Sequence, residues 1–158
     1  QADVYVLAKG LASGYPISAV LFREELGSWP PGAHGTTFGG QAVAAAAAHA
    51  TLDLLEGGLQ ENAARLGEFL LAELRALKRR FPFLGDVRGR GLMIGLDFGD
   101  PDHPQPDLRD KAVRLAFEKG LLLLPAGPSA LRIAPPLVLT QEEAALGLEI
   151  LEEVFRAL

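Results

Sequence analysis

The sequence predicts an α/β fold in which strands and helices alternate along the chain. Short apolar runs lie between glycine and proline clusters, and other segments carry apolar residues at every third or fourth position. Hydrophobic residues make up 49% of the 158 residues, which is enough to pack a core. We expect three parts: residues 1–56 as a piece of one domain, residues 57–80 as a connecting helix, and residues 81–158 as a small α/β domain.

Two strands are expected near the start of the chain. Residues 4–8 form an apolar run that ends at Lys9, and residues 17–22 form a second β-rich run after a cluster of glycine, serine and proline. The first run is typical of a buried strand and follows Gln1 almost at once. A natural domain rarely begins in the middle of a strand, so we expect the chain to be a fragment of a longer polypeptide.

Two helices are expected next. Residues 41–55 are rich in alanine, the residue with the highest helix propensity. Residues 59–77 carry leucine or alanine at intervals of three or four, which is the pattern of a long amphipathic helix. Pro82 is expected to end that helix, because proline cannot continue it.

The C-terminal part is expected to combine short strands with two helices. The order is a bent strand pair over 87–98, a loop over 99–106, a helix from Asp107 to Lys119, and short strands over 121–124 and 131–134. Thr140 and Glu143 have the spacing of a capping box, so the last helix should begin there.

Composition excludes several classes of function. The formal net charge of −5 argues against a nucleic-acid surface or a polybasic membrane patch. Cysteine is absent, which excludes disulfides and thiolate sites, and the three histidines lack the spacing of metal ligands. No uncharged apolar run approaches the roughly 18 to 20 residues that span a bilayer. We therefore expect a cytoplasmic protein that acts on a small molecule, without a metal, a nucleic acid or a membrane as partner.

Lys9 is the first candidate for chemistry. It ends an apolar strand and is followed by Gly10, whose missing side chain lets another group approach the backbone. A lysine that is partly desolvated in such a place can act as an imine-forming nucleophile. Spacing alone leaves the alternative open that Lys9 simply leaves the strand end into solvent.

Two further places could bind anions. Residues 34–40 have the sequence HGTTFGG, and hydroxyls and free N–H groups ahead of a helix suit an anion, although such turns also cap helices. Arg132 stands inside the apolar run 131–134, where an unpaired guanidinium would be costly. Its partner is either a carboxylate of this chain or a substrate carboxylate, which arginine binds through two hydrogen bonds.

Four segments together resemble one known family. They are residues 7–17 (LAKGLASGYPI), 34–40, 85–95 (GDVRGRGLMIG) and 131–137 (LRIAPPL). In order and spacing they resemble the class III, or ω-amino acid, aminotransferases, which depend on pyridoxal phosphate. The resemblance implies the C-terminal part of a fold-type I transferase: the end of the large cofactor-binding domain, a connecting helix and the small domain.

The resemblance also implies a role for each candidate residue. Lys9 would hold pyridoxal phosphate covalently and would move the proton between substrate and cofactor. Thr37, with Thr36 beside it, would bind the cofactor phosphate of the neighbouring subunit, so that a homodimer shares its active sites. Arg132 would bind a substrate carboxylate, notably that of 2-oxoglutarate or glutamate.

On resemblance, the favoured reaction is transamination of 4-aminobutyrate with 2-oxoglutarate as amino acceptor. Residues 29–35 and 131–137 look most like 4-aminobutyrate-type members. Residues 125–128 look like the acetylornithine or ornithine type, which is the alternative. An isomerase of the same cofactor class is a third interpretation, and a non-catalytic truncated domain that acts only in packing or dimerisation is a fourth.

The sequence departs from the family pattern in two ways. Gln41 and Ala42 stand where the family usually has Asn-Pro. The family's phosphate-binding glycine and serine turn, its ring-stacking aromatic and the acidic partner of its ring nitrogen all precede the lysine strand and are absent here. We therefore predict that this chain alone neither binds the cofactor tightly nor transaminates, and that it exposes apolar surface that a longer protein would bury.

Overall fold

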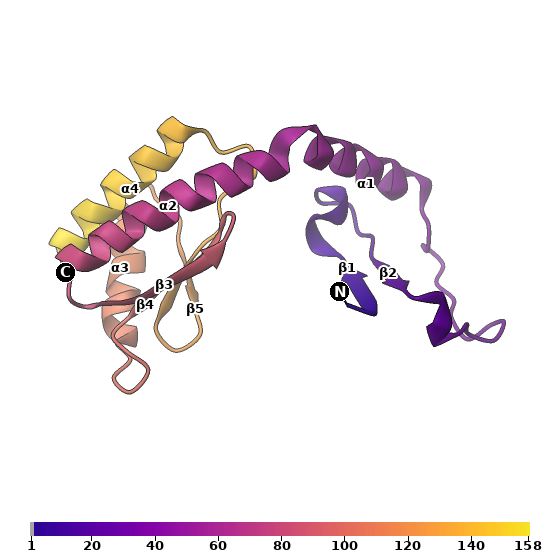
Figure 1. The fold of residues 1–158 in the computed structure, drawn as a ribbon, viewed down its shortest axis with the longest axis horizontal. Coiled ribbons are helices and arrows are strands. Elements are labelled where there is room, and N and C mark those ends of the chain that lie inside the picture. The colour runs from indigo at the N-terminus through magenta and orange to yellow at the C-terminus, as the bar shows by residue number, and fades with distance from the viewer. Residues whose placement is uncertain (1) are drawn as a thin grey trace. The chain divides into compact units, whose positions relative to one another are not determined.

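The computed structural model describes residues 2–158, which form two compact units, residues 2–58 and residues 59–158. Figure 1 shows the order of the elements along the chain. The first unit contains β1 (Val4–Leu7), the 3-10 helix η1 (Lys9–Ala12), β2 (Ala19–Phe22), the 3-10 helix η2 (Glu24–Leu26) and α1 (Ala42–Leu54). Strands β1 and β2 pair antiparallel, as two neighbouring strands joined by a turn do.

The strand pair confirms two predicted elements, but the predicted burial of the first strand is wrong for this chain. The four side chains of β1 are between 41% and 72% exposed. A ribbon of two strands has no second layer of its own to cover its faces, so its apolar side chains stay in contact with water. This apolar surface is the kind that the sequence led us to expect.

The long helix α2 (Gln60–Arg80) follows α1 through the π-helical turn Leu55–Leu59. Gly58 has a φ of 124° in that turn, a conformation that only glycine adopts without strain, and it separates the two helices. Helix α2 thus confirms the predicted long amphipathic helix to within the usual uncertainty of helix ends. Helix α2 packs on strands and on another helix of residues 59–158, so its contacts group it with that unit. The three-part domain division of the parent protein stays a prediction.

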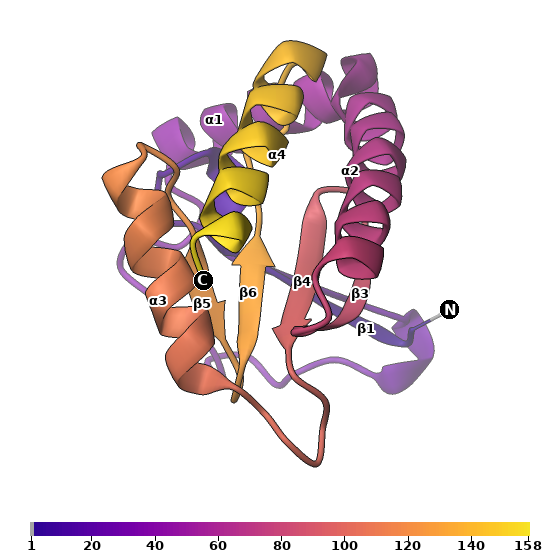
Figure 2. The same cartoon turned by 90° about the vertical axis from the view of Figure 1, so that its left-hand side faces the viewer.

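The second unit is a four-stranded antiparallel sheet with helices on one face. Its strands lie in the order β3 (Leu84–Arg90), β4 (Met93–Phe98), β6 (Ala130–Ile133) and β5 (Leu124–Ala126). Figure 2 shows α2, α3 (Pro106–Glu118) and α4 (Gln141–Arg156) side by side in front of this sheet. The core lies between the helices and the sheet, and its largest fully buried side chains are Phe98, Phe155, Leu66, Leu74, Ile94, Leu96, Leu131 and Val154.

Two predicted boundaries in this unit need correction. Helix α3 begins at Pro106 and not after an Asp107 cap, because proline carries a helical φ and lacks the N–H that a first turn leaves unpaired. Strand β5 covers Leu124–Ala126 and not residues 121–124. It contains Pro125, which a sheet tolerates because β5 is an edge strand.

The predicted capping box of the last helix is confirmed. The backbone N–H of Glu143 donates to the Thr140 hydroxyl at 3.2 Å, and the backbone N–H of Thr140 donates to the Glu143 carboxylate at 2.9 Å. Both bonds satisfy donors that the start of α4 would leave unpaired. Among the helices of residues 2–158, none combines the length and apolar character that a bilayer crossing needs.

Candidate active site

Lys9 occupies an unusual backbone position directly after a strand. It is the first residue of η1, its φ is 54°, and its side chain is exposed. A lysine with a positive φ is uncommon and needs surrounding structure to hold it. That structure is visible beside it: Ala12 of η1 is buried, and the Ser13 hydroxyl bonds to the Thr51 hydroxyl of α1 at 3.0 Å. The expected desolvation of Lys9 is not seen in this chain, which leaves its amine open to water or to a ligand.

Thr36 and Thr37 lie in one exposed turn before α1. The N–H of Gly39 donates to the carbonyl of Thr36 at 3.3 Å, which closes the turn. A hollow of about 470 Å³ lies beside it, lined by residues 16–18, Thr36 and residues 38–40. Helix α1 begins after Gln41, and within the described residues its N-cap side chain makes no capping bond.

The groups around this hollow fit a phosphate. Two residues that carry hydroxyls, Ser18 and Thr36, line it, and the turn that contributes Gly39 and Gly40 leads into the start of a 13-residue helix. Backbone N–H groups and the positive end of a helix dipole attract an anion at such a place. The residues present therefore suit the phosphate of a cofactor, and the N-cap of α1 is Gln41, not one of the two threonines.

Arg132 lies on the open face of the second unit's sheet. On β6 its Cα pairs with that of Gly95 on β4, and the side chain is exposed, whereas Leu131 before it is buried. The alternation of a strand explains how an arginine fits within an apolar run. In the part of the chain that is described, Arg132 forms no ion pair. Of the two partners that the sequence left open, a carboxylate of this chain is thus not used, and the guanidinium is free for an external anion.

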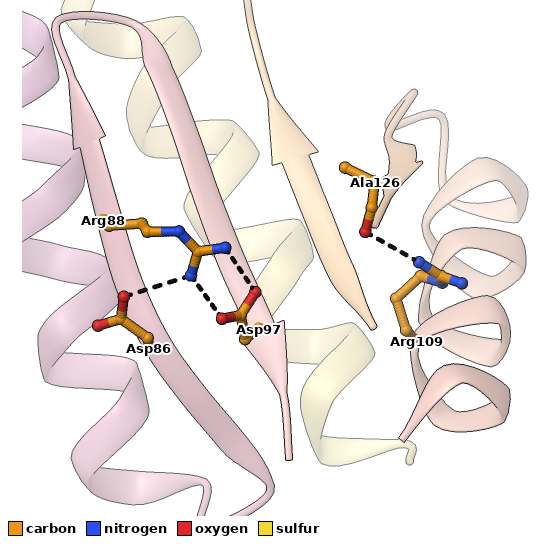
Figure 3. Close-up of polar contacts among 5 residues, drawn as sticks. All are labelled: Asp86, Arg88, Asp97, Arg109 and Ala126. Atoms are coloured by element: carbon orange, nitrogen blue, oxygen red, sulfur yellow. Dashed lines mark hydrogen bonds and ion pairs between the residues drawn. The ribbon is translucent and has the colours of Figure 1, made fainter. Parts of the chain in front are cut away.

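Arg88, in contrast, is paired with two carboxylates on the same sheet (Figure 3). Its guanidinium donates twice to Asp97, at 2.5 and 3.0 Å, and once to Asp86, at 3.2 Å. The hydrogen bonds from Asp97 and then Asp86 raise the pKa of Arg88 above its ordinary value. The sequence suggested that Arg88 flanks a turn or binds an anion, and the structure pairs it with carboxylates of its own hairpin.

Arg109 is a structural residue that the sequence did not single out. Its side chain is only 8% exposed, and its guanidinium donates to the carbonyl of Ala130 at 3.1 Å. It also donates to the carbonyl of Ala126 at 3.5 Å, as Figure 3 shows. These carbonyls flank the turn between β5 and β6. Arg109 therefore holds the turn that leads into the strand of Arg132. An arginine among the polar residues of a helix gives no sequence signal for this role.

The candidate residues fall into both units. Lys9, Thr36 and Thr37 belong to residues 2–58, and Arg132 belongs to residues 59–158. Lys9 does not line the hollow beside Thr36. No group of three or more histidine, aspartate or glutamate side chains that could hold a metal occurs in residues 2–158.

A lysine at a strand end, a hollow lined by hydroxyl-bearing residues and glycines, and an arginine without an ion pair within the described residues are groups that can bind small anionic amino or carbonyl compounds. The family model for class III aminotransferases matches residues 1–155. The chain therefore belongs to the class III aminotransferase family, as the four segments of its sequence predicted.

Curated relatives in this family have more than one activity. The chain is 43% identical over 160 residues to an acetylornithine aminotransferase of Gloeobacter violaceus, with 100% of the chain and 38% of the relative aligned. It is 40% identical over 160 residues to an alanine/serine racemase of Pyrococcus horikoshii, with 99% of the chain and 34% of that relative aligned. The chain thus spans between 34% and 38% of the length of these relatives.

A solved structure confirms the predicted fold class. An amine transaminase from an uncultivated Pseudomonas species, determined in its PLP-bound form, matches with a TM-score of 0.86 and 37% identity. The match covers 98% of this chain and 38% of that one. Both units of the chain therefore have counterparts in a pyridoxal-phosphate enzyme.

Proposed function

We propose that the protein to which this chain belongs is a pyridoxal-phosphate-dependent aminotransferase in which Lys9 binds the cofactor covalently. The observation that carries the proposal is the position of Lys9, directly after β1 and with a positive φ of 54°, inside a chain that matches the class III family over residues 1–155. Strained backbone held in place beside a reactive side chain is typical of functional sites. When bound, pyridoxal phosphate supplies the electron sink that stabilises negative charge on the reacting carbon of the substrate.

The residues of the chain then have distinct tasks. The Lys9 amine moves a proton from the reacting carbon of the amino donor to the cofactor in the first half of the reaction. In the second half it moves a proton from the cofactor to the reacting carbon of the amino acceptor. Thr36 and Thr37 bind the cofactor phosphate through hydroxyl and backbone N–H groups, on behalf of a neighbouring subunit, so the working protein is a homodimer. Arg132 binds the carboxylate of the substrate through two hydrogen bonds.

For the amino donor, we propose acetylornithine in preference to 4-aminobutyrate. The support comes from the relatives, because the acetylornithine aminotransferase of Gloeobacter violaceus is 43% identical to the chain and the one of Bacillus subtilis is 41% identical. The sequence alone favoured 4-aminobutyrate, and nothing in the relatives named here supports that choice. 2-Oxoglutarate is the proposed amino acceptor, with Arg132 as its carboxylate ligand, and the cytoplasm is the proposed compartment.

Racemisation is the second candidate, because a relative of 40% identity is an alanine/serine racemase. The two reactions differ in one requirement. A racemase removes the α-proton and returns a proton to the opposite face of the same carbon, so its amino group stays in place and no 2-oxo acid is needed, whereas a transaminase transfers the amino group to a 2-oxo acid.

The test uses the purified full-length protein loaded with pyridoxal phosphate. We expect glutamate to form from 2-oxoglutarate with N-acetylornithine as donor, faster than with 4-aminobutyrate. Lys9→Ala should lower kcat about 10²- to 10⁴-fold, which is the usual contribution of a catalytic acid–base group. Conversion of L-alanine or L-serine to the D-form without any 2-oxo acid, and no glutamate formation, would overturn the proposal in favour of a racemase. The 158-residue chain alone should be inactive in both assays.

A further inference from the structure

Two arginines occupy one row of the open sheet face. On β3, Arg88 pairs with Gly95 of β4, and on the other side Gly95 pairs with Arg132 of β6. The neighbours of Gly95 on β4, Ile94 and Leu96, point into the core. Because side chains alternate along a strand, Arg88 and Arg132 project from the opposite face, on either side of a glycine.

The side chain of Arg88 lies across the glycine between them. A Cβ placed on Gly95 would lie 3.8 Å from three atoms of Arg88, including the carbon of its guanidinium. In this position Arg88 forms two hydrogen bonds to Asp97 and one to Asp86. The carboxylate of Asp97 is thereby occupied at both oxygens.

Asp97 is a diagonal neighbour of Arg132 in the strand register. Asp97 pairs with Ala130 on β6. Ala130 stands two residues before Arg132, so Asp97 and Arg132 lie on the same face of the sheet. Diagonal neighbours of this kind are about 7–8 Å apart at their backbones, a span that a long side chain covers. Arg132 nevertheless forms no ion pair within residues 2–158. The two oxygens of Asp97 go to Arg88 instead.

We propose that Arg88 is a positioning residue that keeps Arg132 free for its ligand by occupying Asp97. The inference rests on the proposed role of Arg132 in binding a substrate carboxylate. Without Arg88, Asp97 loses its cation, and Arg132, its diagonal neighbour on β6, becomes available to it. A substrate carboxylate must then displace Asp97 before it can bind. An exposed ion pair is weak, so we expect the loss to be about two- to fivefold in affinity.

The first experiment measures the availability of Arg132 directly. The chain is treated with phenylglyoxal, which modifies arginine side chains, and the rate at Arg132 is followed by peptide mass mapping. Arg75, an exposed arginine of α2 without an ion pair in the described residues, is the internal reference. We expect Arg88→Leu to slow modification of Arg132 about two- to fivefold relative to Arg75, because Asp97 now holds the guanidinium.

Two double variants separate capture by Asp97 from a general change of charge. The variants combine Arg88→Leu with either Asp97→Asn or Asp86→Asn. In both, the group formed by positions 86, 88 and 97 keeps the net charge of −1 that it has in the natural protein. Only the first removes the carboxylate that can reach Arg132. We therefore expect the rate at Arg132 to be restored by Asp97→Asn and to stay slow with Asp86→Asn.

Folding and function are checked separately. The Arg88 side chain is 54% exposed, so its loss should not unfold the sheet, and Arg88→Gln repeats the comparison with a polar side chain. In the full-length protein, Arg88→Leu should raise KM for 2-oxoglutarate two- to fivefold at unchanged kcat, and Asp97→Asn should reverse this. Equal modification rates at Arg132 in all variants would overturn the inference, even if transamination is confirmed. The modification result also stands if the protein proves not to be an aminotransferase.

Discussion

Replacement of Gly67 by alanine should destabilise the second unit, although alanine is the better helix former. Gly67 is buried in the middle of α2 and lies against the turn between β3 and β4. A Cβ at this position would stand 2.3 Å from the carbonyl oxygen of Gly91 and 2.6 Å from its Cα. Both are backbone atoms, so no side-chain rotation can relieve the contact, and α2 must move away from the sheet.

The sign follows from two opposing terms. Alanine in place of glycine inside a helix gains about 1 kcal/mol. Forcing an extra carbon into a packed contact costs about 1–3 kcal/mol and more where backbone must shift. We expect a net loss of about 2 kcal/mol. Gly147 of α4 is the matched control, because a Cβ there would meet only Leu121 Cδ1, at 3.9 Å, so Gly147→Ala should stabilise by up to about 1 kcal/mol.

Urea unfolding of the chain, followed by far-UV circular dichroism, measures both variants. The circular dichroism signal reports mainly on the helices, and α2, α3 and α4 all belong to the second unit. With a denaturant dependence of about 1–3 kcal/mol per molar urea, Gly67→Ala should lower the midpoint by about 1 M and Gly147→Ala should raise it by a few tenths. A Gly67→Ala variant as stable as the natural chain would refute the close packing of α2 on the turn.

Three further predictions concern single interactions. Arg109→Met should destabilise the second unit by about 2–4 kcal/mol in urea unfolding, because carbonyls of the β5–β6 turn lose their buried donor. An unchanged urea midpoint would show that the hydrogen bonds from Arg109 to this turn are unimportant. Thr140→Ala should cost about 1 kcal/mol by removal of the capping box, whereas Thr140→Ser should keep most of the stability, and equal losses in both would contradict the capping role. The pKa of Glu152 is lowered, chiefly by its hydrogen bond from Arg80, so its contribution to stability is fully present above the ordinary glutamate pKa and is lost as the pH falls through the lower folded-state pKa. Glu152→Gln should therefore have a lower Tm than the natural chain at neutral pH, and the two Tm values should converge in acid. A difference in Tm that is the same at every pH would speak against the pairing.

Elements fixed by local chemistry could be predicted from the sequence. The capping box of Thr140 and Glu143 places the start of α4, because both partners lie within one helical turn. The periodic leucines of α2 predict a long helix with one buried face. Strand β5 was misplaced, since only the knowledge that it lies at the sheet edge makes Pro125 acceptable within it.

The surroundings of the candidate residues depend on long-range pairing and were less accessible. The positions of Lys9 and Arg132 could be proposed from the sequence, but the state of Arg132 depends on where Arg88 and Asp97 lie on neighbouring strands. The hydrogen bonds from Arg109 join a helix to a turn about 20 residues away, and no local sequence pattern predicts them. The sequence also could not tell that β1 lacks cover within this chain, because burial is a property of the layers that meet.

The most direct test of the central claim is to locate the cofactor on the chain. The full-length protein is isolated with pyridoxal phosphate, reduced with borohydride, digested and analysed by peptide mass mapping. We predict the phosphopyridoxyl group on Lys9, with Lys78, Lys111 and Lys119 unmodified as controls within the same chain. Labelling of a lysine other than Lys9, or no specific labelling in a protein that still transaminates, would contradict the assignment.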